Sequence, residues 1–502
     1  MPQVINTNVS SLNAQRNLNT SQSSLATALQ RLSSGLRINS AKDDAAGLAI
    51  SERMTAQIRG LDQARRNAND GVSLAQTGEG ALSQMGDMLQ RIRELAVQSN
   101  NASNTANDRQ SLNGELNQLV SELDRFSQTT QFNGQNLLDG SLGSATFQVG
   151  ANAFQTITTT TANFRTTSYG TSEYQASGSA SAAASGVSTV NTQSGAAGTS
   201  GANVFSANTT TITSALGSGS VTTVATDSAK TVAAAINTQS QTGVKATART
   251  EALFVFQGTG AVSGTYNLQV WGGTNATSTS GAQISFNVTA NTSTGLADAV
   301  SAFNNVSSQT GVSAKLDNSG TGIVLTAEDG ANISVGATTA TAYNKGYKIQ
   351  NSVNSANSSG TMTVAGNITL DSAKTYSIAG NAAMVSGWAT SGTTASSLQT
   401  VSSLDITSVA NATKALRIVD SALDVVNGQR AVFGALQSRF DNTIANLQTS
   451  SENLSAARSR IRDADFAQET ANMTRSQILQ QAGVAMLAQA NALPNSVLSL
   501  LK

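Results

Sequence analysis

Apolar residues recur at intervals of seven in the C-terminal part of the chain. The run begins at Val419, continues through Phe433 and Phe440, and ends at Ile461. A repeat sustained over this length is typical of a long helix that packs along one seam. The pattern therefore predicts a helix whose seam holds these apolar residues: Val419, Val426, Phe433, Phe440, Leu447, Leu454 and Ile461.

The N-terminal part shows the same periodicity in shorter runs. One run joins Leu18, Leu25 and Leu32, with Leu29 and Leu36 at the interleaved position. A second run extends over residues 61–96 and crosses Asn69-Asp70-Gly71, which by itself favours a turn. Because the heptad passes through unbroken, we predict a continuous helix there.

The last residues of the chain carry a further 4-3 pattern. Its members are Leu479, Gly483, Met486, Ala490, Leu493, Val497 and Leu500. Both ends thus carry more apolar seam than local hairpins need, which indicates helices that require partners. Isolated one-sided helices are marginal in water, so we expect the first and last ~45 residues to order only on association. The candidate association seam is Leu18, Leu25, Leu29, Leu32, Leu36, Leu447, Leu454, Ile461, Met486, Leu493, Val497 and Leu500.

The middle of the chain differs in character. Only 15 of the 239 residues from Thr166 to Leu404 are charged, against 43 of 263 in the flanks. Alternating apolar and polar residues predict strands at 266–271, 283–288 and 361–364. Composition and pattern together predict a β-rich insertion within a helical scaffold.

Two short sequences repeat inside this insertion. Gln-Thr-Gly-Val occurs at 241–244 and 309–312, each time after an Ala-rich segment that suits a short helix. Asp-Ser-Ala-Lys-Thr occurs at 227–231 and again at 371–375. Two or three copies are few for a solenoid, so the repeats favour small β-rich modules with a helix each.

Composition excludes several kinds of chemistry. The chain has no cysteine and no histidine, which removes disulfides, thiol nucleophiles and Ser-His pairs. The 29 basic and 29 acidic residues cancel, so no net charge attracts nucleic acid or an anionic membrane. We expect no enzyme activity, cofactor or metal site, no signal peptide and no membrane insertion.

Two polar features are candidates for a function. Glu328-Asp329 could form an acid–base pair, but the following Gly330 favours a turn. The first 42 residues hold Arg16, Arg31, Arg37 and Lys42 without an acid. This charge is sparse for a nucleic-acid arm, and pairing with acids near the other end of the chain is the better interpretation.

Long motifs occur at both ends of the chain. They are Val4–Asn8, Arg31–Gly47, Gln90–Ser99, Asp465–Glu469, Ile478–Gly483, Leu487–Asn491 and the tail from Pro494 to Leu501. These motifs, in this order, resemble bacterial flagellin. The resemblance covers about 150 residues at the start and about 100 at the end of the chain, and the middle is only loosely similar.

The resemblance implies an α+β multidomain subunit of the secreted, extracellular flagellar filament. Residues 1–45 and 456–502 would form a terminal coiled-coil domain that lines the inner tube. Residues 46–165 and 405–455 would form a second helical domain with a β-hairpin region, and 166–404 the variable outer part. The resemblance also implies unfolded export by the type III apparatus. Expected partners are further copies of the chain, an export chaperone, the filament cap and hook–filament junction proteins.

A receptor contact can also be carried over from the family. Flagellins sensed by Toll-like receptor 5 use an Arg, a Leu and a Glu, and the matching residues here are Arg91, Leu95 and Glu115. From spacing alone, Leu95 fits a helix seam and the two charged residues fit an ordinary surface. Two rival functions remain open: a hook–filament junction protein, and a secreted glycan-binding adhesin that uses the β-rich middle.

Overall fold

The structure is a computed structural model. It describes residues 7–175, 190–192, 208–224, 227–256, 263–273, 281–317, 319–337, 347–350, 362–380 and 392–500. The chain divides into two compact units. The first comprises Met1–Glu79, Leu142–Thr161 and Ala431–Lys502, and the second comprises Gly80–Ser141 and Ala162–Arg430.

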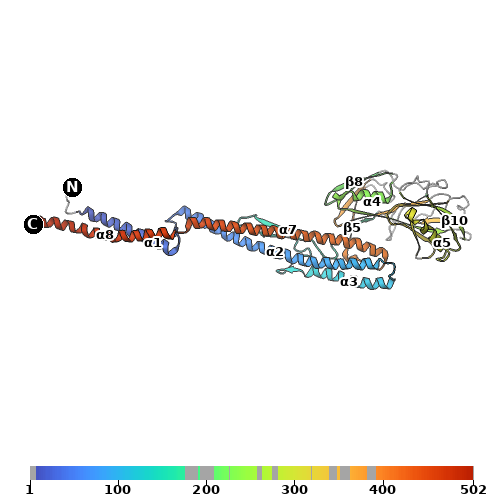
Figure 1. Ribbon diagram of the computed structural model, residues 1–502, viewed down its shortest axis with the longest axis horizontal. Helices are drawn as coiled ribbons and strands as arrows, with labels where there is room; N and C mark the ends of the chain where they lie inside the picture. The colour runs from blue at the N-terminus through green and yellow to red at the C-terminus, as the bar shows by residue number, and fades with distance from the viewer. Residues whose placement is uncertain are drawn as a thin grey trace. The chain divides into compact units, whose positions relative to one another are not determined.

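Long helices occupy both flanks, as the heptads predict, and the α+β fold class is confirmed (Figure 1). The seam of the C-terminal helix is buried where it was expected. Val419, Val426, Phe433 and Phe440 are fully buried, and Leu447 nearly so, whereas Leu454 and Ile461 are half-buried. The helices are α1 (Val9–Ser34), α2 (Ala45–Ser99), α3 (Ala106–Thr129), α7 (Val409–Arg462) and α8 (Phe466–Leu500).

Helix α2 runs without a break through Asn69-Asp70-Gly71, so the continuous helix is confirmed. Packing between α2 and α7 explains why a glycine occupies position 71 of this helix. A Cβ at Gly71 would lie 2.5 Å from Cζ of Phe440, and one at Gly78 would lie 2.8 Å from Cε2 of Phe433. Within the first unit, the aromatic rings of Phe433 and Phe440 on α7 therefore pack directly against the backbone of α2 at its two glycines.

Helix α1 ends earlier than the leucine pattern predicts. Gly35 adopts the left-handed conformation with φ 69°, and its N–H donates to the Arg31 carbonyl at 2.8 Å. This is a C-cap that glycine adopts with little strain. The placement of Leu36 in the helical seam was therefore wrong, because Leu36 forms a β-bridge with Asp463 instead.

Two hairpins accompany the helices. In the first, Asn133 and Gly134 both have positive φ, as a tight turn requires. The second belongs to the first unit, and Phe147 from its first strand meets Phe440 edge-on with ring centroids 5.5 Å apart. The strands are β1 (Gln131–Phe132) with β2 (Gln135–Asn136), and β3 (Ser144–Gln148) with β4 (Thr156–Thr160).

The described part of the insertion folds into three antiparallel sheets. The strands expected at 266–271 and 283–288 are confirmed, and so is the described part of 361–364. The largest sheet runs β12 (Ser313–Leu316), β13 (Ile323–Ala327), β9 (Lys245–Phe256), β17 (Asn367–Ser372), β5 (Gly170–Gln175) and β20 (Ser397–Thr400), with β15 (Tyr347–Gln350) also on β9. The second runs β11 (Ala282–Val288), β10 (Gly264–Gly273), β14 (Asn332–Ala337), β16 (Met362–Val364) and β6 (Val190–Thr192). The third runs β19 (Gly392–Ala395), β18 (Tyr376–Gly380), β7 (Asn208–Ser214) and β8 (Ser218–Thr223).

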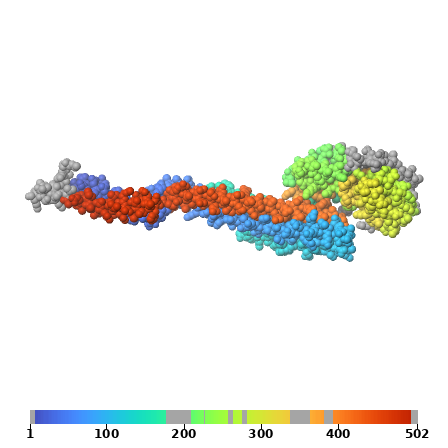
Figure 2. All heavy atoms as spheres, viewed as in Figure 1, coloured from blue at the N-terminus to red at the C-terminus, as the bar shows by residue number. Residues whose placement is uncertain are grey.

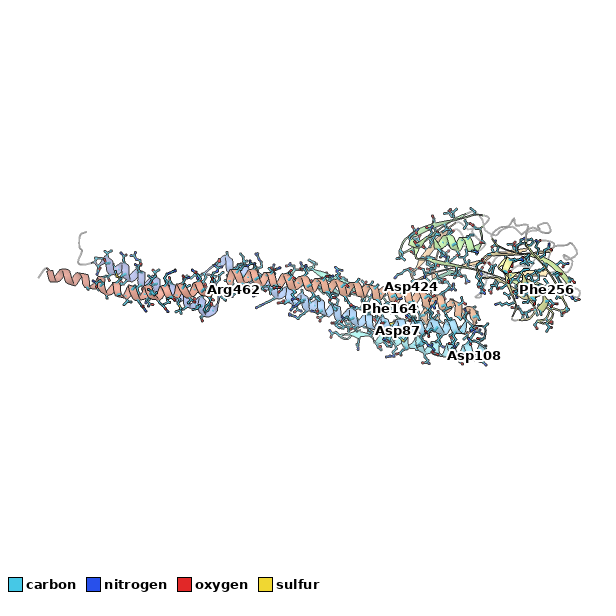
Figure 3. The ribbon with its side chains drawn as sticks, viewed as in Figure 1. Asp87, Asp108, Phe164, Phe256, Asp424 and Arg462 are labelled. Atoms are coloured by element: carbon cyan, nitrogen blue, oxygen red, sulfur yellow. The ribbon has the colours of Figure 1, made fainter. Side chains whose placement is uncertain are left out.

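Two apolar cores support these sheets. An aromatic cluster around Phe256 includes Tyr266, whose ring stacks on Phe286 with centroids 5.8 Å apart (Figure 3). The other core lies under the helix α4 and includes Ile236, Ile368 and Tyr376. The short helices are α4 (Ala229–Asn237), α5 (Ala297–Asn305) and α6 (Ser307–Thr310), with 3₁₀ turns at Ser240–Thr242 and Val401–Ser403.

The Gln-Thr-Gly-Val repeat marks a repeated local structure. In the first copy, the Asn237 side chain at the end of α4 donates to and accepts from the backbone of Ala246 at 2.9 and 2.8 Å. In the second copy, Asn304 at the end of α5 makes the same two bonds to Ala314 at the same distances. The glycine of each copy is left-handed, with φ 63° at position 243 and 69° at position 311. Both helices thus connect to the next strand through one amide and one glycine.

The Asp-Ser-Ala-Lys-Thr repeat has no such common structure. In the first copy Ser228 and Thr231 form a capping box at the start of α4. In the second copy Asp371 and Ser372 close strand β17, paired with β5. Strand pairing overrides the capping signal in the second copy, because its flanking residues already belong to the sheet.

We predict that Gly71→Ala lowers the free energy of unfolding although alanine favours helices. Overpacking against Phe440 should cost about 1–3 kcal/mol, against a helix-propensity gain of about 1 kcal/mol. Gly80 is the matched control, since a Cβ there meets nothing within 4 Å on the same helix. Gly80→Ala should stabilise by up to about 1 kcal/mol. Urea unfolding monitored by circular dichroism measures both, and equal effects would contradict the proposed contact.

Candidate functional site

Helices α1 and α8 pack antiparallel along one another in the first unit (Figure 1; Figure 2). Their inward positions follow 3-4 spacing, and many are small or polar. A Cβ at Gly483 would lie 3.4 Å from Cδ1 of Leu18, so the helices approach closely there. The inward residues are Ser11, Ala14, Leu18, Ser21, Leu25, Ala28 and Leu32 on α1, and Glu469, Met473, Ser476, Gln480, Gly483, Leu487 and Ala490 on α8.

Polar contacts define the register of this helix pair. Asn8 caps α1 by accepting from the Ser11 N–H at 3.0 Å, and its amide donates to the Ala490 carbonyl at 2.8 Å. The Ser11 hydroxyl donates to Oδ1 of Asn491 at 2.8 Å. A shift of either helix by one turn would lose these bonds together, so they select one alignment of the two chain ends.

A second set of contacts joins the other end of the pair. The backbone N–H of Arg37 donates to the Arg462 carbonyl at 2.7 Å, and Ala464 N–H donates to the Gly35 carbonyl at 3.0 Å. Nη1 of Arg31 lies 3.7 Å from Oε1 of the buried Glu469. Arg462 is labelled in Figure 3 at the turn between α7 and α8. The expected pairing between N-terminal basic and C-terminal acidic residues is thus confirmed for Arg31 with Glu469.

Large apolar side chains remain uncovered on this helix pair. Leu29 on α1 is 47% exposed, whereas its neighbour Leu25 faces α8 and is half-buried. On α8, Leu479 is 52% and Met486 64% exposed, so Leu487 and not Met486 faces α1. The periodicity of α8 could not decide this, because apolar residues occupy more than one side of the helix. A shallow groove on the outer surface of α8 is lined by Ala467, Thr470, Ala471, Thr474, Arg475, Ile478 and Leu479.

The remaining expected seam residues fall into two groups. Leu18, Leu25 and Leu32 face α8, and Leu447 is nearly buried on α7. Helix α8 extends to Leu500. The side chains of Leu493, Val497 and Leu500 lie outside the described residues.

The residues carried over as a receptor contact lie in the second unit. Nη2 of Arg91 on α2 lies 2.8 Å from Oε1 of Glu115 on α3, and both side chains are about half exposed. Nη1 of Arg91 also pairs with Glu94 at 3.0 Å. Hydrogen bonding to Glu115 raises the pKa of Arg91. The two charged residues therefore form one surface pair across two helices.

Leu95 does not belong to this surface. Its side chain is fully buried, together with Leu89, Ile92 and Leu116. This burial corrects the expectation that Leu95 forms part of a receptor contact. The position of Leu95 in the helix places its side chain in the core between helices. The surface candidate is reduced to Arg91 and Glu115.

Glu328 and Asp329 form no acid–base pair in the structure. Oε2 of Glu328 accepts from Arg249 at 2.9 Å, and Asp329 accepts from Lys230 at 2.8 Å. Gly330 follows with φ 76°, so the predicted turn is confirmed. Among the described residues no three metal-ligating side chains cluster, and no helix there is both long and apolar enough to cross a membrane.

Comparison with known proteins identifies the family. The bacterial flagellin N-terminal helical region matches residues 5–142, and the C-terminal helical region matches 416–501. The B-type flagellin of Pseudomonas aeruginosa is 45% identical over 518 aligned residues that cover 100% of both chains. The chain belongs to the flagellin family. Flagellin of Salmonella rubislaw is 38% identical over 100% of both chains, and Flagellin A of Vibrio anguillarum 34% over 99%.

The flagellin match extends into the insertion. The flagellin hook IN motif matches residues 209–260, which contain the first copy of the Asn–Gly helix connection. Two solved structures, FliC from Burkholderia pseudomallei and FlgL from Xanthomonas campestris, align with TM-scores of 0.29 and 0.31 and identities of 21% and 14%. They cover 74% and 82% of this chain and 99% of their own. These scores are too low to bear on the fold of this flagellin.

We predict that Leu95→Ala and Glu115→Ala have very different effects on stability. Removing the buried leucine should lower the free energy of unfolding by about 2–5 kcal/mol, because a cavity remains in the core. Removing the exposed carboxylate should cost at most about 1 kcal/mol, since surface ion pairs contribute little. Thermal or urea unfolding measures both. A small effect at Leu95 would argue that this leucine is available to a partner after all.

Proposed function

We propose that the chain is the structural subunit of a bacterial flagellar filament, secreted and extracellular, and that it assembles by itself into a helical polymer without catalysis. The observation that carries this proposal is the apolar surface left on the paired α1 and α8. Exposed apolar residues follow both helices, and no described segment covers them: Val9, Leu12 and Leu29 on α1, and Phe466, Ile478, Leu479, Val484 and Met486 on α8. Contiguous exposed apolar surface marks an interface.

We infer that its occupant is the same surface on further copies of the chain. In this scheme, residues 1–45 and 456–502 form the terminal domain of the inner tube. Residues 46–165 and 405–455 form the second helical layer, and 166–404 form the outer part. The high charge of the flanks and low charge of the middle support the boundaries of the outer part at 166 and 404.

Folding of the terminal helices and assembly would be one coupled step. The α1–α8 seam contains many small and polar residues, among them Ser11, Ser21, Ser476 and Gln480. Such a seam buries little apolar area, and ordering costs about 1–2 kcal/mol per residue in backbone entropy. Burying the outer leucines and methionine against neighbouring subunits supplies the missing stabilisation. The monomer would then hold these ends loosely.

Coupled folding also suits export through a narrow channel. A chain whose ends order only on assembly can remain unfolded until it reaches the growing tip. In this proposal an export chaperone covers the apolar end in the cell. A cap and hook–filament junction proteins provide the assembly site.

We predict that Leu479→Asp prevents filament growth and leaves the rest of the monomer unchanged. A carboxylate on the outer surface of α8 would replace an apolar contact and would have to be desolvated in the polymer. Leu216→Asp is the matched control, since Leu216 is an exposed leucine in the insertion. Electron microscopy of monomer seeded with filament fragments measures growth, and circular dichroism checks the monomers.

Growth of Leu479→Asp to normal filaments would contradict the assembly surface. Unmutated chain that forms only a short zone on the seeds would favour the junction protein. Binding to a glycan array through the insertion, without growth, would favour the adhesin. Long filaments from the unmutated chain and from Leu216→Asp support the proposal.

We further propose that monomeric chain is a ligand of Toll-like receptor 5 through Arg91 and Glu115. Arg91→Ala should raise the concentration for half-maximal receptor signalling by about 30-fold, since truncating a charged anchor commonly costs about 2 kcal/mol. Arg125→Ala is the control, because Arg125 is an exposed α3 residue that also pairs with a glutamate, Glu122. Reporter cells that express the receptor measure both, and equal responses would contradict the site.

A further inference from the structure

A row of charged side chains crosses three strands of the largest sheet and faces helix α7. Asp371 on β17 pairs in register with Glu173 on β5 at one side and with Lys245 on β9 at the other. Residues directly opposite in neighbouring strands project to the same face. The row therefore places two carboxylates next to each other and one ammonium beside them.

Helix α7 supplies the opposite charges from one side. Arg417 reaches both carboxylates, with Nη2 3.3 Å from Oε1 of Glu173 and Nη1 3.2 Å from Oδ2 of Asp371. Nζ of Lys414 lies 3.9 Å from Glu173. Lys245 of the sheet lies 3.7 Å from Asp424 of the helix, which Figure 3 labels. These ion pairs link the β-rich insertion to α7 inside the second unit.

The two carboxylates sit in a dry and crowded place. The side chains of Glu173 and Asp371 are each only 9% exposed, and they share a single guanidinium. Oδ1 of Asp371 is buried and has no hydrogen-bond partner among the described residues. When two neighbouring carboxyl groups in a low dielectric are both ionised, their negative charges repel each other. A proton on one of them removes this repulsion.

We propose that this row is a pH-dependent joint: a proton taken up by Asp371, beside Glu173, in mildly acidic solution tightens the docking of the insertion on α7. The joint is distinct from the assembly surface of α1 and α8. It governs how firmly the outer part is held to the helix that carries it.

The direction of the pH dependence follows from the folded carboxyl. Burial raises the pKa of Asp371 to about 6, with Arg417 opposing this rise and Glu173 adding to it. The other charged or titratable groups facing it are Lys245 and Tyr376. Burial raises the pKa of Tyr376 above its ordinary value, and the nearby Asp371 carboxylate adds to this rise. A group with a raised folded pKa binds its proton more tightly when docked, so docking strengthens as pH falls through about 6 and is complete near the ordinary value of 3.8.

A single introduced cysteine can report the opening of the joint, because the chain has none of its own. Thr171 lies two residues from Glu173, on the same face of β5, and is fully buried. In Thr171→Cys, the rate of modification by a disulfide reagent relative to that of the unfolded chain measures protection. From about pH 7.5 to about pH 5, protection should rise by about tenfold.

Two variants and one second probe decide the outcome. Asp371→Asn in the Thr171→Cys chain should abolish the rise, and Glu173→Gln should reduce it by removing the neighbouring charge. Asp329→Asn is the matched control, since Asp329 is an exposed aspartate of the insertion paired with Lys230, and it should leave the rise intact. The second probe is Ala299→Cys, because Ala299 on α5 is buried in the aromatic core, which contains no residue of β17 or β5. It should show no rise, since α5 can be exposed without releasing Asp371 from α7.

Protection of the thiol in Thr171→Cys that is constant or falls on acidification would overturn the proposal. So would a rise that survives Asp371→Asn, or an equal rise in Ala299→Cys, which would indicate general stabilisation. If circular dichroism shows that Asp371→Asn does not fold, Glu173→Gln decides: an undiminished rise overturns the role of the carboxylate pair, and a reduced rise supports it.

Discussion

Close helix packing along heptad seams is the constraint on which the rest of the molecule depends. In the first unit the phenylalanine rings of α7 pack against glycines of α2, and α1 packs against α8 along a seam of small residues. Each contact joins residues that are several hundred positions apart in the chain. Because both ends of the chain belong to the same helical scaffold, the chain between them must leave that scaffold after the N-terminal helices and re-enter it at α7. That requirement makes the β-rich middle an insertion rather than a separate C-terminal domain.

The two helix pairs solve the packing problem differently. On α7 the seam is large and aromatic, and Phe433 and Phe440 are fully buried. On α1 and α8 the seam is small and partly polar, and large apolar residues lie outside it. The first pair buries its apolar surface within one chain, whereas on the second pair no described segment covers the outer apolar residues. This difference is the physical basis for proposing an assembly surface on the second pair.

The insertion contains small modules in which a short repeated sequence specifies how a helix connects to the next strand. Asn237 and Asn304 each connect a short helix to the next strand by the same two hydrogen bonds. Such a connection is local, since its bonded residues lie nine and ten positions apart in the chain. The attachment to α7 is non-local and depends on charge instead. Arg417 joins Glu173 and Asp371, which are far apart in the chain, and in our proposal this attachment responds to pH.

The sequence by itself determined the long helices through their heptads and the β-rich middle through alternation and composition. It also determined a short helix before each Gln-Thr-Gly-Val copy, because each of these features depends on residues close in sequence. It also predicted that α2 continues through Asn69-Asp70-Gly71. Three matters were decided only by tertiary structure. Gly35 ended α1 before Leu36, since a bridge to Asp463 competed with another helical turn. Leu95 became core rather than surface because α2 is covered by neighbours along that side. Which apolar side of α8 meets α1 depended on the fit between Gly483 and Leu18, a contact between opposite ends of the chain that no local pattern encodes.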